Sequence, residues 1–155
     1  MKDEKGFYPR ALGEIAIRCA DMAVMVTFYE DVIGLQRLSG GHDDAITFFK
    51  IAEGFGGHTT VLALFQHNGA TPSDLIPGGN APPATGPGSS LHHIALSLPF
   101  AKQDAVMRWY DKIGQPYRVE RFGWIGWRGI FTQDPEGNTV ELVAYAAAML
   151  DETVE

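Results

Sequence analysis

The sequence predicts an α+β fold made of two βαβββ modules in tandem. An internal repeat is the first observation: LGEIAIRC (12–19) aligns with LHHIALSL (91–98), and FYEDVIG (28–34) aligns with WYDKIG (109–114). The second observation is the stretch 67–90, which holds five of the nine prolines and five glycines and so cannot sustain a helix or a central strand. Matches in the same order on both sides of such a connector favour duplication of one module.

Each module shows the same order of elements. A strand with alternating apolar residues comes first, then a helix with apolar residues three or four apart, ending at Gly34 or Gly114. Asp134-Pro-Glu-Gly-Asn138 predicts a turn before the last strand. The expected elements are strand 12–19, helix 22–33 and strands 35–39, 44–52 and 58–66, then strand 91–98, helix 100–113 and strands 116–122, 127–133 and 138–145. The chain thus divides into an N-terminal extension 1–11, a first module 12–66, a linker 67–90 of a length that some proteins use as a lid, a second module 91–145 and a tail 146–155.

Composition narrows the class of protein. The net charge is −7, which argues against nucleic acid or an anionic membrane as a partner, because both require a basic surface. No apolar run approaches the ~20 residues of a membrane span, and the first residues show no signal peptide. A single cysteine, Cys19, excludes an internal disulfide framework. A cytoplasmic protein with a small-molecule partner is expected.

The repeat places candidate ligands on one face. Side chains alternate along a strand, so His93 is expected on the polar face of 91–98, and His92 at the strand edge on the outer side. Glu14 occupies in the first module the position that His93 occupies in the second. We treat His42, His58 and His67 as surface residues, with His67 a weak candidate because it closes a strand.

Glu141 is the third candidate. It stands alone as a carboxylate among apolar residues of the last strand, where it is costly unless it is paired or bound to a cation. Its counterpart in the first module is Ala63 or Leu62, neither of which ligates a metal. Glu14, His93 and Glu141 together offer an imidazole and two carboxylates, which suit a divalent cation such as Zn²⁺, Ni²⁺, Mn²⁺ or Fe²⁺.

Each candidate also has an ordinary structural interpretation. His93 is compatible with a hydrogen-bonded structural histidine, and Glu14 with an ion pair to Arg18. Glu141 is compatible with an ion pair to Arg121 or Arg128. The conjunction of three candidate ligands, two of them related by the repeat, favours the metal.

These segments resemble a known family. GEIAIRCADMAVMVTFYEDVIGL, LHHIAL and DPEGNTVEL are similar to the vicinal oxygen chelate superfamily, which includes glyoxalase I, extradiol dioxygenases and bleomycin- and fosfomycin-resistance proteins. The resemblance covers about 12–145 and implies a curved, cup-shaped mixed sheet around a metal. It implies that His93 and Glu141 are second-module ligands. Glu14 stands where many members have histidine, and the fourth position holds Ala63 or Leu62.

The resemblance implies a glyoxalase-like metalloprotein, a lyase or isomerase that acts through a chelated enediolate-type intermediate, with Glu14 as a ligand or as the catalytic base. A homodimer is also expected, because paired cup-like modules expose sheet edges that often pair across a two-fold axis. An extradiol-type dioxygenase is the first alternative, although one histidine position here holds glutamate. A metal-free binding protein of the bleomycin-resistance type is the second alternative. Substrate-binding residues are expected in the aromatic stretch of the second module, namely Phe122, Trp124, Trp127 and Arg128, with packing and surface solvation as the alternative roles.

Overall fold

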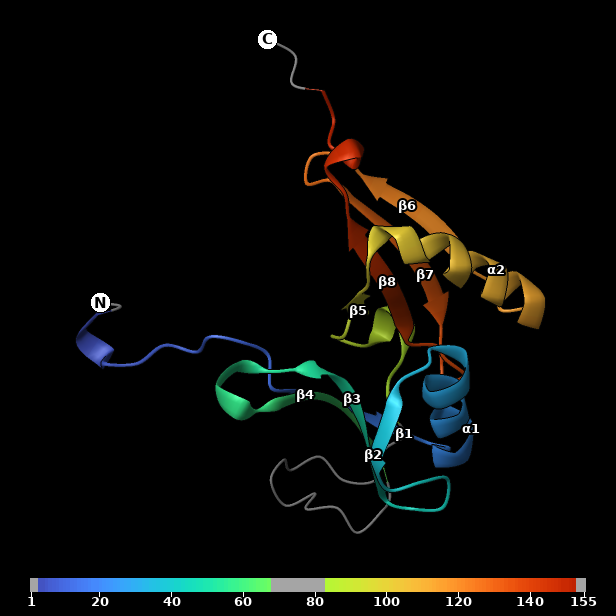
Figure 1. The fold of residues 1–155 in the computed structure, drawn as a ribbon. Coiled ribbons are helices and arrows are strands. Elements are labelled where there is room, and N and C mark those ends of the chain that lie inside the picture. The colour runs from blue at the N-terminus through green and yellow to red at the C-terminus, as the bar shows by residue number, and fades with distance from the viewer. Residues whose placement is uncertain (1–2, 68–82, 153–155) are drawn as a thin grey trace. The chain divides into compact units, whose positions relative to one another are not determined.

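The computed structural model describes residues 3–67 and 83–152, and the chain divides into two compact units, Met1–Pro83 and Ala84–Glu155. Each unit is βαβββ, which confirms the predicted fold class (Figure 1). Most of the predicted linker, residues 68–82, lies outside the described residues; of its remainder, Gly86–Gly88 forms one 3₁₀ turn. None of the described helices is long and apolar enough to cross a membrane.

The first unit contains a four-stranded mixed sheet in the order β1-β4-β3-β2. The parallel pair is β1 with β4, and the other neighbours are antiparallel. Helix α1 begins after Asp21, whose carboxylate accepts a hydrogen bond from the Val24 amide at 3.3 Å. The elements are β1 (Glu14–Cys19), α1 (Met22–Thr27), which continues as a π-helical turn (Phe28–Val32), β2 (Gln36–Ser39), β3 (Ile46–Glu53) and β4 (Thr59–Gln66).

The second unit repeats this topology in the order β5-β8-β7-β6. Helix α2 ends at Gly114, which adopts the left-handed conformation with φ 72°, as the sequence predicts for a helix stop. The predicted turn before β8 is confirmed, because the Asp134 carboxylate accepts hydrogen bonds from the Glu136 and Asn138 amides at 2.9 and 3.0 Å. The elements are β5 (Ile94–Ser97), α2 (Gln103–Ile113), β6 (Arg118–Phe122), β7 (Trp127–Gln133) and β8 (Thr139–Tyr145).

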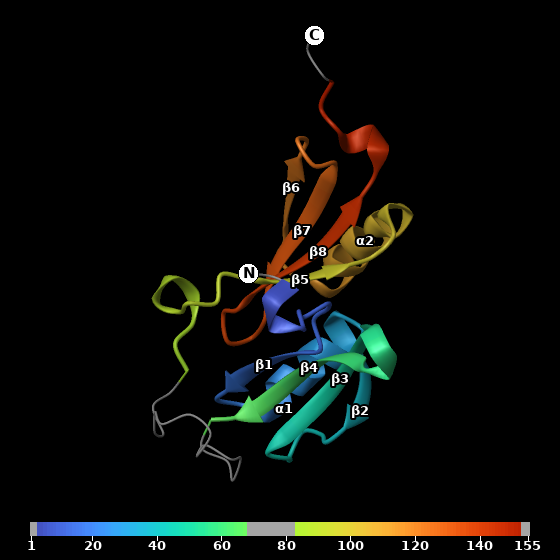
Figure 2. The same cartoon turned by 90° about the vertical axis from the view of Figure 1, so that its left-hand side faces the viewer.

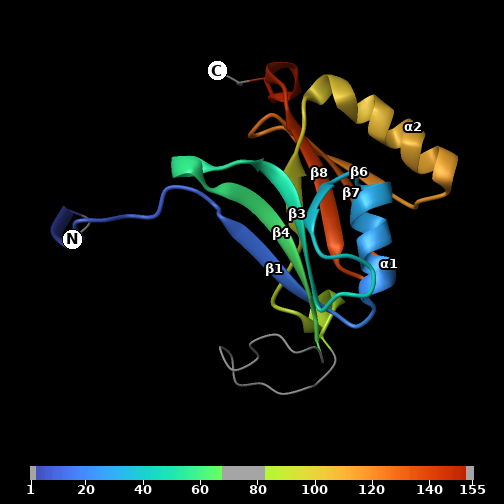
Figure 3. The same cartoon turned by 60° about the horizontal axis from the view of Figure 1, so that its bottom comes forward.

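In each unit one face of the sheet packs against the helix, as Figures 2 and 3 show for α1 and α2 separately. Most of the buried residues between the sheet and the helix are apolar, and they supply most of the core. They include Cys19, Met25, Tyr29, Phe49, Leu62 and Leu64 in the first unit, and Ile94, Tyr110, Ile130, Val140, Leu142 and Ala144 in the second. We call the opposite side of each sheet its open face.

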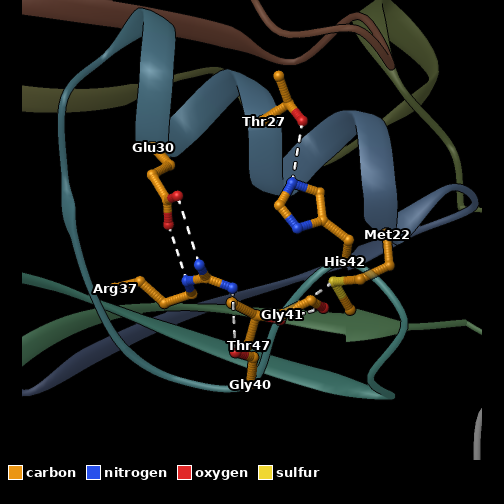
Figure 4. A network of polar contacts seen from close by, with 8 residues as sticks. All are labelled: Met22, Thr27, Glu30, Arg37, Gly40, Gly41, His42 and Thr47. Carbon is orange, nitrogen blue, oxygen red and sulfur yellow. Dashed lines mark hydrogen bonds and ion pairs between the residues drawn. The ribbon is translucent and has the colours of Figure 1, made fainter.

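Polar contacts hold the loop between β2 and β3 against α1 and its π-helical extension (Figure 4). Arg37 forms an ion pair with Glu30 at 2.8 Å, and Thr47 donates a hydrogen bond to the Gly41 carbonyl at 3.1 Å. His42 Nε2 lies 3.1 Å from the Thr27 hydroxyl. His42 therefore has a structural contact on an exposed loop, in agreement with its assignment as a surface residue.

Tyr110 of α2 carries a buried hydroxyl in the core of the second unit. Its side chain is 0 % exposed, and no described residue hydrogen-bonds its hydroxyl. Burial raises the pKa of this phenol from 10.0 to about 12. The native state therefore favours the neutral phenol, and the resulting stability is present below pH 10 and is lost as the pH rises toward 12.

We predict that the free energy of unfolding of Tyr110→Phe at pH 7 equals that of the wild type or exceeds it by up to about 1 kcal/mol, because the substitution removes an unsatisfied buried hydroxyl. As the pH rises from 10 to 12, the wild type should lose roughly 2–3 kcal/mol of unfolding free energy that the variant retains, because each unit of pKa difference corresponds to about 1.4 kcal/mol. Urea unfolding at several pH values measures both effects. Tyr29→Phe, at the equivalent position of the first unit, is the control; loss of stability in Tyr110→Phe at pH 7 would contradict the prediction.

Candidate functional site

The strand register settles which residue corresponds to Glu141. In the second unit Ala95 pairs with Glu141, and in the first unit Ala16 pairs with Ala63. Ala95 and Ala16 are equivalent in the repeat. Ala63, not Leu62, is therefore the counterpart of Glu141, and the first unit has no ligating side chain at that position.

His93 and Glu141 lie together in the second unit. His93 Nε2 is 3.4 Å from Glu141 Oε1, and the two side chains are 32 % and 4 % exposed respectively. The alternative ion pairs of Glu141 with Arg121 or Arg128 are not formed. Arg121 donates to the Met149 carbonyl at 2.9 Å, and Arg128 donates to Gln103 Oε1 at 2.7 Å. The buried carboxylate is thus paired with an imidazole instead of a guanidinium.

His93 lies on the side that alternation predicts, since it contacts Glu141 and Phe131 of the open face. Strand β5 begins only at Ile94, so both histidines precede it, and His92 is exposed. Their rings are in contact, with centroids 5.0 Å apart and the two Nδ1 atoms 2.7 Å apart. The alternation holds within the strand itself, where Ile94 and Leu96 are buried and Ala95 and Ser97 are exposed.

Gly129 leaves the space that the Glu141 side chain fills. A Cβ atom at Gly129 would lie 2.1 Å from Glu141 Oε2, which is closer than any real contact. The register makes Ile46 the counterpart of Gly129, because Ile46 pairs with Phe65 where Gly129 pairs with Val143. One unit therefore combines isoleucine with alanine on its open face, and the other combines glycine with glutamate.

Burial raises the pKa of Glu141, and the neighbouring His93 opposes part of this rise. The environment therefore disfavours the ionised carboxylate unless a positive charge lies beside it. A cation bound by His93 and Glu141 would supply that charge.

The donor atoms fit a divalent metal. Two ligand atoms at about 2.0–2.1 Å from a tetrahedral ion are separated by about 3.3 Å, near the 3.4 Å between His93 Nε2 and Glu141 Oε1. The same distance is long for a direct hydrogen bond. Within the described parts of each unit, however, no group of three or more His, Cys, Asp or Glu side chains is arranged to hold a metal.

Glu14, the third candidate, belongs to the first unit. It is the exposed first residue of β1 and pairs with Val61 of β4. The alternation of β1 puts Arg18 on the same face. The equivalence of Glu14 with His93 holds in the register, since each lies two residues before the alanine that pairs with Ala63 or Glu141.

Aromatic side chains continue the open face of the second unit. The ring of Phe131 lies 5.9 Å from that of His93 and 6.3 Å from that of Phe122. Trp127 pairs with Phe122 across the two strands and lies two residues from Gly129, so it shares this face. Trp124 lies in the turn between β6 and β7 and is 77 % exposed.

Arg128 is not on this face. Its guanidinium donates to Gln103 of α2, lies over the Phe100 ring at 4.4 Å from the centroid, and is 3.9 Å from Asp104. Odd and even residues of β7 point to opposite sides of the sheet, and Arg128 lies on the helix side. The structure therefore separates Arg128 from Phe122 and Trp127, with which the sequence grouped it.

An open cavity of about 830 Å³ in the second unit is lined by Phe131 but not by His93 or Glu141. Phe131 links the two features, because its ring contacts His93 and also lines the cavity. The other lining residues carry no motif that marks them in the sequence, although the alternation of β6 puts Arg118 and Glu120 on the side of Phe122. Those lining residues include Gln115, Tyr117, Arg118, Glu120 and Gln133.

Comparison with known proteins gives a family and a fold. The model of the Glyoxalase/Bleomycin resistance protein/Dioxygenase superfamily matches residues 11–142. A lactoylglutathione lyase structure from Agrobacterium tumefaciens is 22% identical, with 88% of this chain and 95% of that chain covered and a TM-score of 0.62. A search of curated proteins finds no significant match.

Other solved structures agree in fold at lower identity. A glyoxalase/bleomycin resistance protein/dioxygenase from Nocardioides is 16% identical over 99% of this chain and 95% of that one, with a TM-score of 0.62. A genomically encoded fosfomycin resistance protein from Listeria monocytogenes is 14% identical over 92% and 98%, with a TM-score of 0.61. At these identities the likeness establishes the fold alone.

We predict that Glu141→Gln stabilises the metal-free protein at neutral pH. The pKa of Glu141 is raised in the native state, so its contribution favours folding below the unfolded-state pKa and is lost as the pH rises through the native pKa. Glutamine keeps the shape and removes the ionisation. Thermal unfolding at pH 4 and pH 7 should show a gain that grows with pH. Glu53→Gln is the control with the opposite sign, because the ion pair with Lys50 lowers the pKa of Glu53.

We predict that Gly129→Ala costs about 1–3 kcal/mol of unfolding free energy, because the new methyl group overlaps the Glu141 carboxylate. The double variant Gly129→Ala/Glu141→Ala should recover most of this loss, since the first unit tolerates a larger side chain beside Ala63. Gly88→Ala, where a Cβ meets nothing within 4 Å, is the control. Additive effects in the double-mutant cycle would contradict the overlap.

Proposed function

For this chain, which belongs to the Glyoxalase/Bleomycin resistance protein/Dioxygenase superfamily, we propose a divalent-metal-dependent lyase or isomerase that acts on a small substrate with two neighbouring oxygen atoms. The observation that carries the proposal is the buried Glu141 carboxylate beside His93 Nε2 at 3.4 Å. These two residues would hold the ion, and Zn²⁺, Ni²⁺, Mn²⁺ and Fe²⁺ all accept such ligands. When bound, the ion would supply Lewis-acid polarisation of the substrate oxygens.

The residues of the second unit suit the remaining tasks. Phe131 and Phe122 form an apolar wall beside His93, which would exclude water from the reacting atoms. The cavity beside Phe131 has room for a small molecule, and Arg118 and Glu120 give it polar groups. We propose that the substrate binds in this cavity.

Glu14 is proposed as the third ligand or as the base that moves a proton. The proposal rests on the register, which gives Glu14 in the first unit the position of His93 in the second. Glu14 is exposed, and a carboxylate side chain can serve as a proton acceptor. A homodimer is part of the same proposal.

We predict that the chelator-stripped protein binds one equivalent of a divalent metal per chain. At a free metal concentration of 100 times Kd the native state gains about 2.7 kcal/mol, which corresponds to a rise of roughly 5–10 °C in Tm for a chain of this size. His93→Ala and Glu141→Gln should abolish the rise, and Glu14→Gln should weaken it. Titration calorimetry and thermal shift with Zn²⁺, Ni²⁺ and Mn²⁺, and with Fe²⁺ under anaerobic conditions, measure the effect.

His42→Ala is the matched control, because His42 lies on an exposed loop of the other unit. Metal binding by His93→Ala and Glu141→Gln at wild-type affinity would reject the proposed ligands. Stabilisation by cationic aromatic compounds together with no response to any metal would favour a sequestering protein.

A further inference from the structure

His92 contacts His93, one of the two proposed metal ligands of the second unit. Its Nδ1 atom lies 2.7 Å from His93 Nδ1, a distance at which one nitrogen must donate a proton and the other accept it. His92 is exposed, so its Nε2 atom can exchange protons with water. His93 is therefore contacted at both ring nitrogens, by His92 at Nδ1 and by Glu141 at Nε2.

Without a metal, the Glu141 oxygen at 3.4 Å favours a proton on His93 Nε2 by electrostatic attraction, although the separation is long for a hydrogen bond. With its proton on Nε2, His93 accepts at Nδ1 the hydrogen bond from Nδ1–H of His92. With a metal on Nε2, His93 must carry its proton on Nδ1 and donate it. The pair meets both requirements because an imidazole Nδ1 can either donate or accept.

We propose that His92 is the positioning residue of His93, and that both imidazoles exchange tautomers when the metal binds. The Nδ1–H bond of His92 breaks as its proton passes to His93 Nδ1. His93 releases its Nε2 proton to water, and His92 takes a proton from water at Nε2. The pair gains and loses no net proton, and the hydrogen bond between the rings persists in both states.

The metal half of this inference rests on the proposed function, whereas the hydrogen bond can be tested without metal. Long-range ¹H–¹⁵N correlation spectra distinguish the two tautomers of each histidine. The spectra are recorded at about pH 8.5. In metal-free wild type we expect Nδ1–H on His92 and Nε2–H on His93. In His93→Phe the preference of His92 for Nδ1–H should disappear.

Zn²⁺, which is diamagnetic, tests the exchange directly. Addition of Zn²⁺ to wild type should move the proton of His92 to Nε2 and that of His93 to Nδ1. His92→Phe should weaken Zn²⁺ binding by about 10–100-fold, as expected for loss of a ligand's hydrogen-bond partner. His92→Asn, which keeps an acceptor oxygen at the place of Nδ1, should retain wild-type affinity, and His42→Phe is the surface control.

The outcomes separate the two proposals. If His92 shows the same tautomers in wild type and His93→Phe, or if His92→Phe binds Zn²⁺ as wild type does, the role of His92 is refuted even though metal binds. If wild type binds no metal while His92 prefers Nδ1–H only in the presence of His93, the proposed function fails and the positioning contact stands.

Discussion

Space for one carboxylate on the open face of the second sheet is the constraint on which the candidate site depends. In the observed conformation Glu141 Oε2 occupies the space that a Cβ atom at position 129 would fill, and glycine at that position leaves this space open. The first unit shows the alternative solution at the same two positions, where Ile46 stands near Ala63. Both combinations fill the sheet surface, but only one brings an ionisable group against His93. The site thus depends on which residues occupy positions 129 and 141, because the same fold accommodates either combination.

The two units agree where the helix packs and differ where chemistry is possible. Tyr29 and Tyr110 occupy the same place in the repeat, and both are fully buried. The helix sides of β4 and β8 are apolar in both units. The open faces have diverged, since Phe48 and Phe131 are retained as partners of Ala63 and Glu141 while the partners themselves differ. Burial against a helix constrains residue type, and this constraint keeps the fold constant while one face varies.

Much of this arrangement could be predicted from the sequence, because alternation and Gly/Pro signals report local physics. They gave the element order, the turn at Asp134 and the shared face of Ala95 and Glu141. Two relations were not predicted. Alternation placed His93 on the side of Glu141, but the contact between His92 and His93, which precede β5, was missed. Arg128 was grouped with Trp127 as a neighbour in sequence, although adjacent strand residues face opposite sides.

The environment of Glu141 supports the proposed role in binding rather than a role in folding. Its burial disfavours the charged form, so in the metal-free protein an ionised Glu141 lowers the free energy of unfolding at neutral pH. The fold does not require a carboxylate there, because the equivalent position of the first unit is filled by a fully buried alanine. His93 offsets part of the burial cost, yet its distance of 3.4 Å is too long for a strong hydrogen bond. These features agree with the proposed role of Glu141 as a metal ligand.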